Sequence, residues 1–181
     1  SNYSNYLLVN GAVRPLLTVF RLQITSLVVE GSTPDGNNQA LVVMPILVVL
    51  NKLAQANAQI KTMIKHEIFP PEHEDEFRTK AKHSLIDAKQ TSSSSSSSSD
   101  HKMAPVDAPP GTLRWKIIRL MTWTESNTKR CASELLWTLC ESNPKEFVLR
   151  TGFGNAVHMM GIKGLVKLPK DSTTATADTI R

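Results

Sequence analysis

The sequence has no long apolar segment and no recognisable targeting signal. Its longest strictly apolar run, residues 40–50, contains Pro45 and is 11 residues long, whereas a helix needs about 20 such residues to cross a bilayer. A charged start followed by an apolar core and a small-residue cleavage site, the pattern of a secretory signal, does not open the chain. We therefore expect no integral membrane segment and a cytoplasmic location, with the cell cortex as one option within it.

The chain is also poor in the residue groupings that carry out chemistry. Its two cysteines, Cys131 and Cys140, are nine residues apart, which turns them to different faces of a helix and excludes Cys-x-x-Cys metal or redox chemistry. Gly152 and Gly154 lack the third glycine and the preceding strand of a phosphate loop, so a helix-ending turn is the better interpretation. No nucleophile, base and orienting residue can be drawn from one ordered region. The sequence predicts no catalytic residue, metal site, cofactor or small-molecule substrate.

What the sequence has instead is a series of short apolar stripes at helical spacing. The sequence 143–146, Asn-Pro-Lys-Glu, gives the clearest helix start, with a capping residue, a proline in the first turn and a glutamate three residues after the cap. The predicted helix starts are Ala12, a position near Pro45, Asn57, Thr112, Asn127, Asn143 and Asn155. Short helices with one apolar face bury it by stacking on neighbours. The predicted fold is all-α, a helical-repeat array, with a globular helical bundle as the alternative.

Composition divides the chain into four parts. Residues 1–71 and 113–168 carry the apolar stripes and are predicted helical-repeat segments. Residues 72–112 include an acidic cluster at 72–76 and eight consecutive serines, and we expect a disordered Ser/Pro-rich insertion because so little there can be buried. Residues 169–181 are predicted to form a disordered tail. The chain starts at Ser1 rather than methionine, so we expect a piece of a longer protein.

Positive charge is concentrated in the last third of the chain. Residues 113–181 carry 11 basic and 6 acidic side chains, against 5 and 3 in residues 1–71. Such a bias favours nucleic acid, an anionic membrane surface or an acidic protein as partner. We favour an acidic protein and expect no nucleic acid, because no recognised nucleic-acid motif or aromatic-interleaved basic stripe accompanies the charge.

Several motifs, spaced as in one known family, give a more specific indication. They are Arg119–Thr122, Lys129–Cys140 and Thr151–Ala156, preceded by Pro45–Leu47 and Ile68–Pro71. Together they resemble the C-terminal part of the synembryn family, the "resistance to inhibitors of cholinesterase" proteins. In that family a short connection follows the Pro-Pro pair. This chain has roughly two dozen more residues there, which a repeat array accepts when the insertion loops outward.

The resemblance implies an armadillo/HEAT-like superhelix and a partner, the α subunit of heterotrimeric G proteins. Family members act as guanine-nucleotide exchange factors and folding chaperones, and their concave face captures the C-terminal helix of the α subunit. Such exchange needs no acid or base, because tighter binding to the nucleotide-free conformation expels GDP. Two alternatives stay open: a generic helical-repeat protein-binding adaptor, and a nucleic-acid-binding helical domain that uses the basic C-terminal third.

Two groups of residues are candidates for contact with a partner. Lys116, Arg119 and Trp123 recur at i, i+3 and i+7, and we expect them opposite the apolar stripe, where they can present two cations and an aromatic ring to a carboxylate. Lys61 and Lys65 lie one turn apart where synembryn proteins carry a basic, partner-facing cluster. For each group the alternative is an ordinary solvated helix face, with Trp123 partly buried.

Overall fold

The computed structural model describes residues 2–9, 11–28, 40–71, 108–123 and 126–166, and within these ranges it is all-α without strands. The prediction of an all-α fold is confirmed. The described helices are α1 (Asn2–Val9), α2 (Val13–Leu27), α3 (Ala40–Ala56), α4 (Ala58–Ile68), α6 (Leu113–Met121), α7 (Ser126–Leu139), α8 (Pro144–Thr151) and α9 (Phe153–Ile162). The acidic cluster at 72–76, the serine run and the tail at 169–181 lie outside the described residues.

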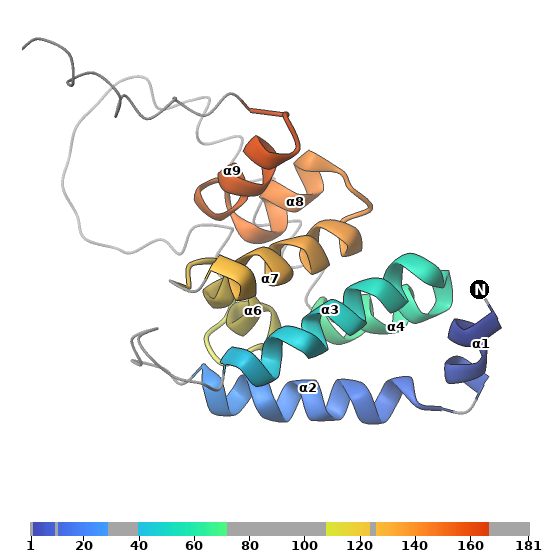
Figure 1. Cartoon of the computed structure of the whole chain (residues 1–181). Coiled ribbons are helices and arrows are strands. Elements are labelled where there is room, and N and C mark those ends of the chain that lie inside the picture. Colours follow the sequence, from blue (N-terminus) through green and yellow to red (C-terminus); the bar gives the residue numbers. More distant parts are fainter. Residues whose placement is uncertain (1, 10, 29–39, 72–107, 124–125, 167–181) are drawn as a thin grey trace, which may run out of the picture.

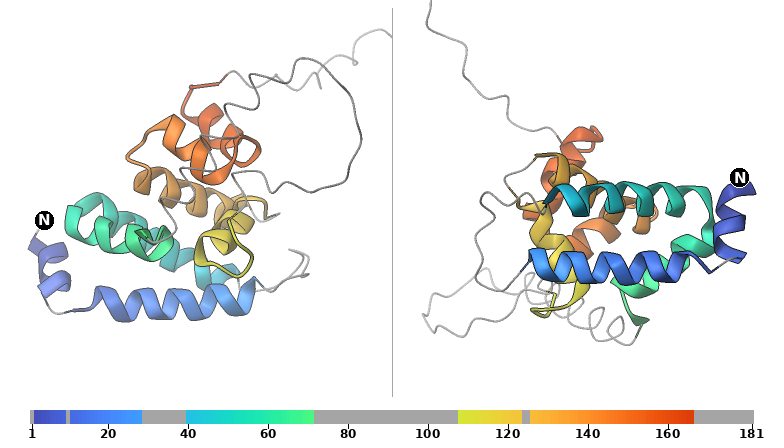
Figure 2. Two further views of the ribbon diagram at one scale, coloured as in Figure 1. Left: turned by 180° about the vertical axis from the view of Figure 1, so that it is seen from behind. Right: turned by 60° about the horizontal axis from the view of Figure 1, so that its bottom comes forward.

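The helices form a layered stack in which neighbours in sequence are mostly neighbours in space. Figure 1 shows α2 at the bottom of the view, α3, α4 and α6 above it, then α7, with α8 and α9 at the top. The most extensive packing is between α3 and α7, and α2 also contacts α6. The view from behind in Figure 2 (left) shows the same order. Contacts of α3 with α7 and of α2 with α6 therefore join helices from both sides of the insertion.

One continuous apolar core runs through these layers. Each helix from α2 to α9 contributes buried side chains to it, and many are inaccessible to solvent. The residues with no exposed surface include Phe20, Ile24, Leu47, Leu50, Ile60, Ile64, Ile117, Leu120, Leu135, Leu136 and Phe147. Burying an aliphatic or aromatic side chain of this size contributes about 1.5–3 kcal/mol. The stack is thus the arrangement that the separate stripes require. None of the described helices has both the length and the hydrophobicity needed to cross a membrane.

Three of the predicted helix starts are confirmed by their capping bonds. The Asn57 side chain accepts hydrogen bonds from two backbone N–H groups of α4, at 2.8 and 3.1 Å. Thr112 accepts one from the first turn of α6 at 3.2 Å. Asn143 accepts two from the first turn of α8, at 3.0 and 3.3 Å. These side chains satisfy backbone donors that have no partner inside the helix.

Other boundaries differ from the prediction. Helix α3 begins at Ala40 and continues through Pro45, so the predicted start near that proline is wrong. A proline in a helix interior removes a backbone hydrogen bond at a cost of about 3 kcal/mol, and the buried neighbours Val43 and Leu47 offset it by tertiary packing. Helices α7 and α9 begin one and two residues before the predicted asparagine caps. Helix α1 was not predicted, and Gly11, with φ of 67°, makes the turn that follows it.

Replacing Asn143 with alanine is expected to lower the free energy of unfolding by about 1 kcal/mol, because α8 loses its N-cap. Urea unfolding followed by circular dichroism measures the change. Asn143→Asp keeps an acceptor and is the matched control, with little expected loss. Equal stabilities for the alanine and aspartate variants would contradict this interpretation of the cap.

Candidate partner-binding site

The candidate site is built around the end of α4, where the chain leaves the helix at Phe69. This ring is 4% exposed and lies between two arginines from later helices. The guanidinium carbon of Arg150 lies 4.2 Å from the ring centroid, and that of Arg114 lies 5.9 Å from it. Cation–π contacts of this kind are worth about 0.5–2 kcal/mol, more when water is excluded. Phe69 thereby fixes the end of α4 against α6 and α8.

Arg150 is held by a polar network that joins α6 to α8. Its side chain is 2% exposed, and Nε donates a hydrogen bond of 2.6 Å to Glu146 Oε1, one turn earlier in α8. Its backbone carbonyl accepts bonds from Arg114 Nε at 3.0 Å and Nη2 at 2.6 Å. A guanidinium is tolerated at such depth only with a counter-charge and hydrogen bonds. The network therefore keeps the surface on both sides of Phe69 in a fixed shape.

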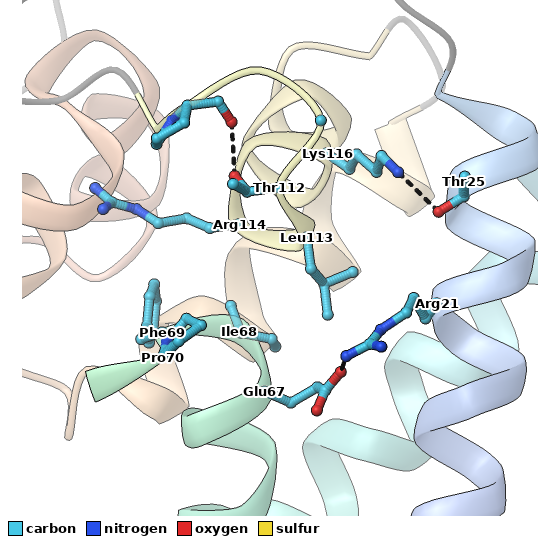
Figure 3. A pocket seen from close by; sticks show the side chains of 12 residues that line it. Arg21, Thr25, Glu67, Ile68, Phe69, Pro70, Thr112, Leu113, Arg114 and Lys116 are labelled. Carbon is cyan, nitrogen blue, oxygen red and sulfur yellow. Dashed lines mark hydrogen bonds and ion pairs between the residues drawn. The ribbon is translucent and has the colours of Figure 1, made fainter. Parts of the chain in front are cut away.

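A first pocket, the α2–α4–α6 pocket, lies on one side of Phe69 and has a cavity volume of about 340 Å³. Figure 3 shows its lining side chains, drawn from α2, the end of α4 and the start of α6. The lining residues are Arg21, Thr25, Glu67, Ile68, Phe69, Pro70, Pro109, Gly111, Thr112, Leu113, Arg114 and Lys116. Arg21 forms an ion pair with Glu67, and Lys116 Nζ donates to Thr25 Oγ1 at 2.7 Å.

A second pocket of about 300 Å³, the α4–α8 pocket, lies between the end of α4 and α8 and shares Phe69 with the first. Its lining residues are Lys61, Thr62, Lys65, His66, Phe69, Pro71, Glu141 and Arg150. Lys61 Nζ donates to Glu141 Oε2 at 2.6 Å. Glu141 and its neighbour Ser142 both have positive φ, 55° and 56°, and this left-handed turn after α7 carries Glu141 to Lys61. Cations outnumber carboxylates in this lining, which favours an anionic partner.

The structure brings some of the sequence-predicted residues together and separates others. Lys61 and Lys65 line the α4–α8 pocket, whereas Lys116 lines the α2–α4–α6 pocket. Arg119 is exposed on α6, with its guanidinium carbon 5.7 Å from the centroid of Trp115. Trp123 is only 9% exposed and belongs to the apolar core.

The expectation that Trp123 shares an exposed face with Lys116 and Arg119 is therefore wrong. The expectation assumed that the helix continues to Trp123, but α6 ends at Met121. Beyond that end the i+7 spacing no longer places a side chain on the helix face, and the large apolar ring is buried instead. Whether any of the predicted residues contacts a partner stays a prediction.

Sequence reasoning missed Arg21, Thr25 and Arg114. The ion pair of Arg21 with Glu67 joins residues 46 positions apart, and Lys116 lies 91 positions from Thr25. No local pattern indicates such contacts. Arg114 was more accessible to prediction, because it lies two residues before Lys116 in the basic last third of the chain.

Neither cysteine lines either pocket. Cys140 is 1% exposed, Cys131 is half-buried, and neither forms a disulfide. Burial raises the pKa of the Cys140 thiol to about 12, although the nearby Arg150 charge acts in the opposite direction. Cys140 is therefore a small residue of the apolar core.

A maleimide at pH 8 is expected to modify Cys131 in the folded protein and to leave Cys140 unmodified. With a pKa near 12, only about one Cys140 thiol in ten thousand is ionised at that pH, and the thiolate is the reactive form. Peptide mass spectrometry locates the label, and Cys131→Ser should remove native labelling altogether. Rapid native labelling of Cys140 would show that its burial is wrong.

These features define a class of fold: an all-α stack of short helices with a basic surface. Residues 98–179 match the family model described as guanine nucleotide exchange factor synembryn. This C-terminal part of the chain is therefore similar to the synembryn family, as the sequence motifs predicted.

Individual relatives agree with the family match. A protein named chaperone Ric-8A from Xenopus laevis is 46% identical over 55 residues, which cover 30% of this chain and 10% of the relative. Chaperone Ric-8A from Gallus gallus is 27% identical over 122 residues, 67% of this chain and 17% of the relative. The Danio rerio protein of that name is 24% identical over 136 residues, which cover 75% of this chain and 20% of the relative. The matched part of the chain thus spans between a tenth and a fifth of these relatives.

Proposed function

We propose that this chain contributes to a guanine-nucleotide exchange factor and folding chaperone for heterotrimeric G-protein α subunits. The observation that carries the proposal is the match of residues 98–179 to the synembryn family model, together with relatives named chaperone Ric-8A. The protein acts as a non-catalytic scaffold in the cytoplasm, with an armadillo/HEAT-like array as its framework. It needs no cofactor, because binding alone supplies the free energy.

The mechanism is a shift of the conformational equilibrium of the α subunit. A surface that binds the open, nucleotide-free conformation more tightly than the GDP-bound one raises the population of the open form. Each tenfold shift requires about 1.4 kcal/mol of differential binding free energy. The same preference stabilises a nascent subunit that has not yet bound nucleotide.

The basic surface on either side of Phe69 is the contact region that we assign to the partner. Lys61 and Lys65 come from α4, and Lys116 and Arg119 come from α6. Among the described residues, Lys65 and Arg119 have no carboxylate within ion-pair distance, so their charges are available to a partner. Trp123 belongs to the apolar core, so we assign it no direct contact with the partner. The C-terminal helix of the α subunit is the element we expect here.

Release of fluorescent GDP from a purified α subunit tests the proposal. The described chain, and an extended protein that contains it, should accelerate release and co-precipitate the subunit. No binding by the extended protein would overturn the proposal. Binding without accelerated release would limit it to chaperone activity.

A generic helical-repeat adaptor is the second candidate. The observation that favours it is the α2–α4–α6 pocket, whose volume of about 340 Å³ suits one or two side chains of a peptide from any partner. A competition experiment distinguishes the two candidates. A peptide from the C-terminus of the α subunit should displace the partner in the first case and leave it bound in the second.

A further inference from the structure

The α2–α4–α6 pocket combines an apolar wall with a cationic rim. Ile68 and Phe69 are buried at the end of α4, and Leu113 faces them from the first turn of α6 (Figure 3). The volume of about 340 Å³ is at the lower end of the range for ligand pockets. It suits one or two apolar side chains of an extended segment and is too small to enclose a helix.

The charges at the rim are not balanced. Arg21 and Lys116 are two cations at the rim, and Glu67 is the single carboxylate of the lining. Glu67 is paired with Arg21. Lys116 Nζ contacts only the neutral hydroxyl of Thr25 among the described residues. An ammonium group gains roughly twice as much from a carboxylate acceptor as from a neutral one, so a carboxylate from outside can replace the bond to Thr25.

Arg21 extends the cationic rim toward solvent. Its side chain is 61% exposed, and a guanidinium has enough N–H donors to serve a second carboxylate while it keeps the first. Arg21 and Lys116 line the pocket from different helices, α2 and α6, and Figure 3 shows Arg21 reaching toward Glu67 and Lys116 reaching toward Thr25. A ligand with two carboxylates can therefore bridge the two helices.

We infer that this pocket binds an acidic peptide segment of a partner protein. An apolar side chain of the segment lies against Ile68, Phe69 and Leu113, and flanking aspartate or glutamate side chains pair with Lys116 and Arg21. Free phosphate satisfies the cations but makes no apolar contact with Ile68, Phe69 or Leu113. An apolar peptide without acids contacts the apolar wall but gives Lys116 and Arg21 no carboxylate. The inference goes beyond the proposed function, because it concerns the chemistry of the segment and applies to any partner.

The test uses a fluorescein-labelled peptide with the central sequence Asp-Leu-Phe-Glu, amidated at its C-terminus so that its carboxylates are side chains. Fluorescence anisotropy with the whole chain should show saturable binding. Amide chemical shifts in a titration of ¹⁵N-labelled protein should change around Thr25 and Leu113. Replacing Asp and Glu by Asn and Gln, or Leu and Phe by Ala, should each weaken binding at least tenfold.

Two variants separate the pocket from general electrostatics. Lys116→Glu should weaken binding at least tenfold, and Lys116→Met should weaken it less. Lys52→Glu, an exposed lysine of α3 outside the pocket lining, should leave binding within twofold. Circular dichroism confirms that the variants are folded.

Several results would overturn the inference. One is the absence of saturable binding, and another is that the Lys116→Glu variant binds the peptide as tightly as the wild type does. A third is that the peptide whose Leu and Phe are replaced binds as tightly as the original peptide. The last result, with full displacement by inorganic phosphate, would identify a simple anion site. A dimer in sedimentation velocity that excludes the peptide would identify a second copy of the chain as the occupant.

Discussion

Replacing Arg150 with alanine is expected to lower the free energy of unfolding by about 3–5 kcal/mol, the usual cost of removing one partner of a buried ion pair. The side chain is 2% exposed, bonds to Glu146 Oε1 at 2.6 Å and lies over Phe69. The alanine variant loses the ion pair, the ring contact and the packed volume together. Urea unfolding monitored at 222 nm measures the change.

Two controls show whether the loss of stability comes from the buried network or from any substitution in α8. Lys145→Ala, at an exposed position of the same helix, should change the stability by less than about 0.5 kcal/mol. The double variant Arg150→Met with Glu146→Leu removes both charges and should recover much of the loss, because apolar replacements of buried pairs are often neutral. A loss below about 1 kcal/mol for Arg150→Ala would show that the network does not hold the site.

Reversing the charge of Lys65 is expected to weaken binding to the α subunit about tenfold or more. Lys65 lines the α4–α8 pocket, and no carboxylate of the described residues lies within ion-pair distance of it. Its replacement by glutamate therefore breaks no ion pair of the folded chain and acts on the partner. The double variant with Lys61→Glu should bind still less, although that change also places a carboxylate beside Glu141.

Surface plasmon resonance with immobilised α subunit at two salt concentrations measures this effect. The wild-type affinity should fall with salt and the Lys65→Glu affinity should fall less, since one screened attraction is gone. Lys52→Glu, exposed on α3, is the matched control. Equal affinities for Lys65→Glu and Lys52→Glu would remove the α4–α8 pocket from the interface.

The features that sequence predicted well are those set by local physics. Asn57, Thr112 and Asn143 cap helices because a short polar side chain can reach the backbone donors of the next turn. The apolar stripes indicated which faces are buried, and hence an all-α stack. The synembryn motifs at 119–122, 129–140 and 151–156 lie within the residues that the family model matches, whereas those at 45–47 and 68–71 lie outside them.

The features that sequence missed depend on tertiary packing. Pro45 is placed inside α3 because Val43 and Leu47 are buried on either side of it. Trp123 is buried because α6 stops at Met121, and spacing alone does not reveal that end. The α2–α4–α6 pocket joins residues 46 and 91 positions apart. Such contacts are decided by how the layers stack, so the candidate site could be predicted only in part.

The relative affinity of an extended protein containing this chain for two forms of the α subunit tests the central claim most directly. Isothermal titration calorimetry compares the nucleotide-free subunit with the GDP-loaded one. We expect binding to the nucleotide-free form to be at least tenfold tighter, which is about 1.4 kcal/mol of differential affinity. Equal affinity for both forms, or no binding to either, would contradict the account.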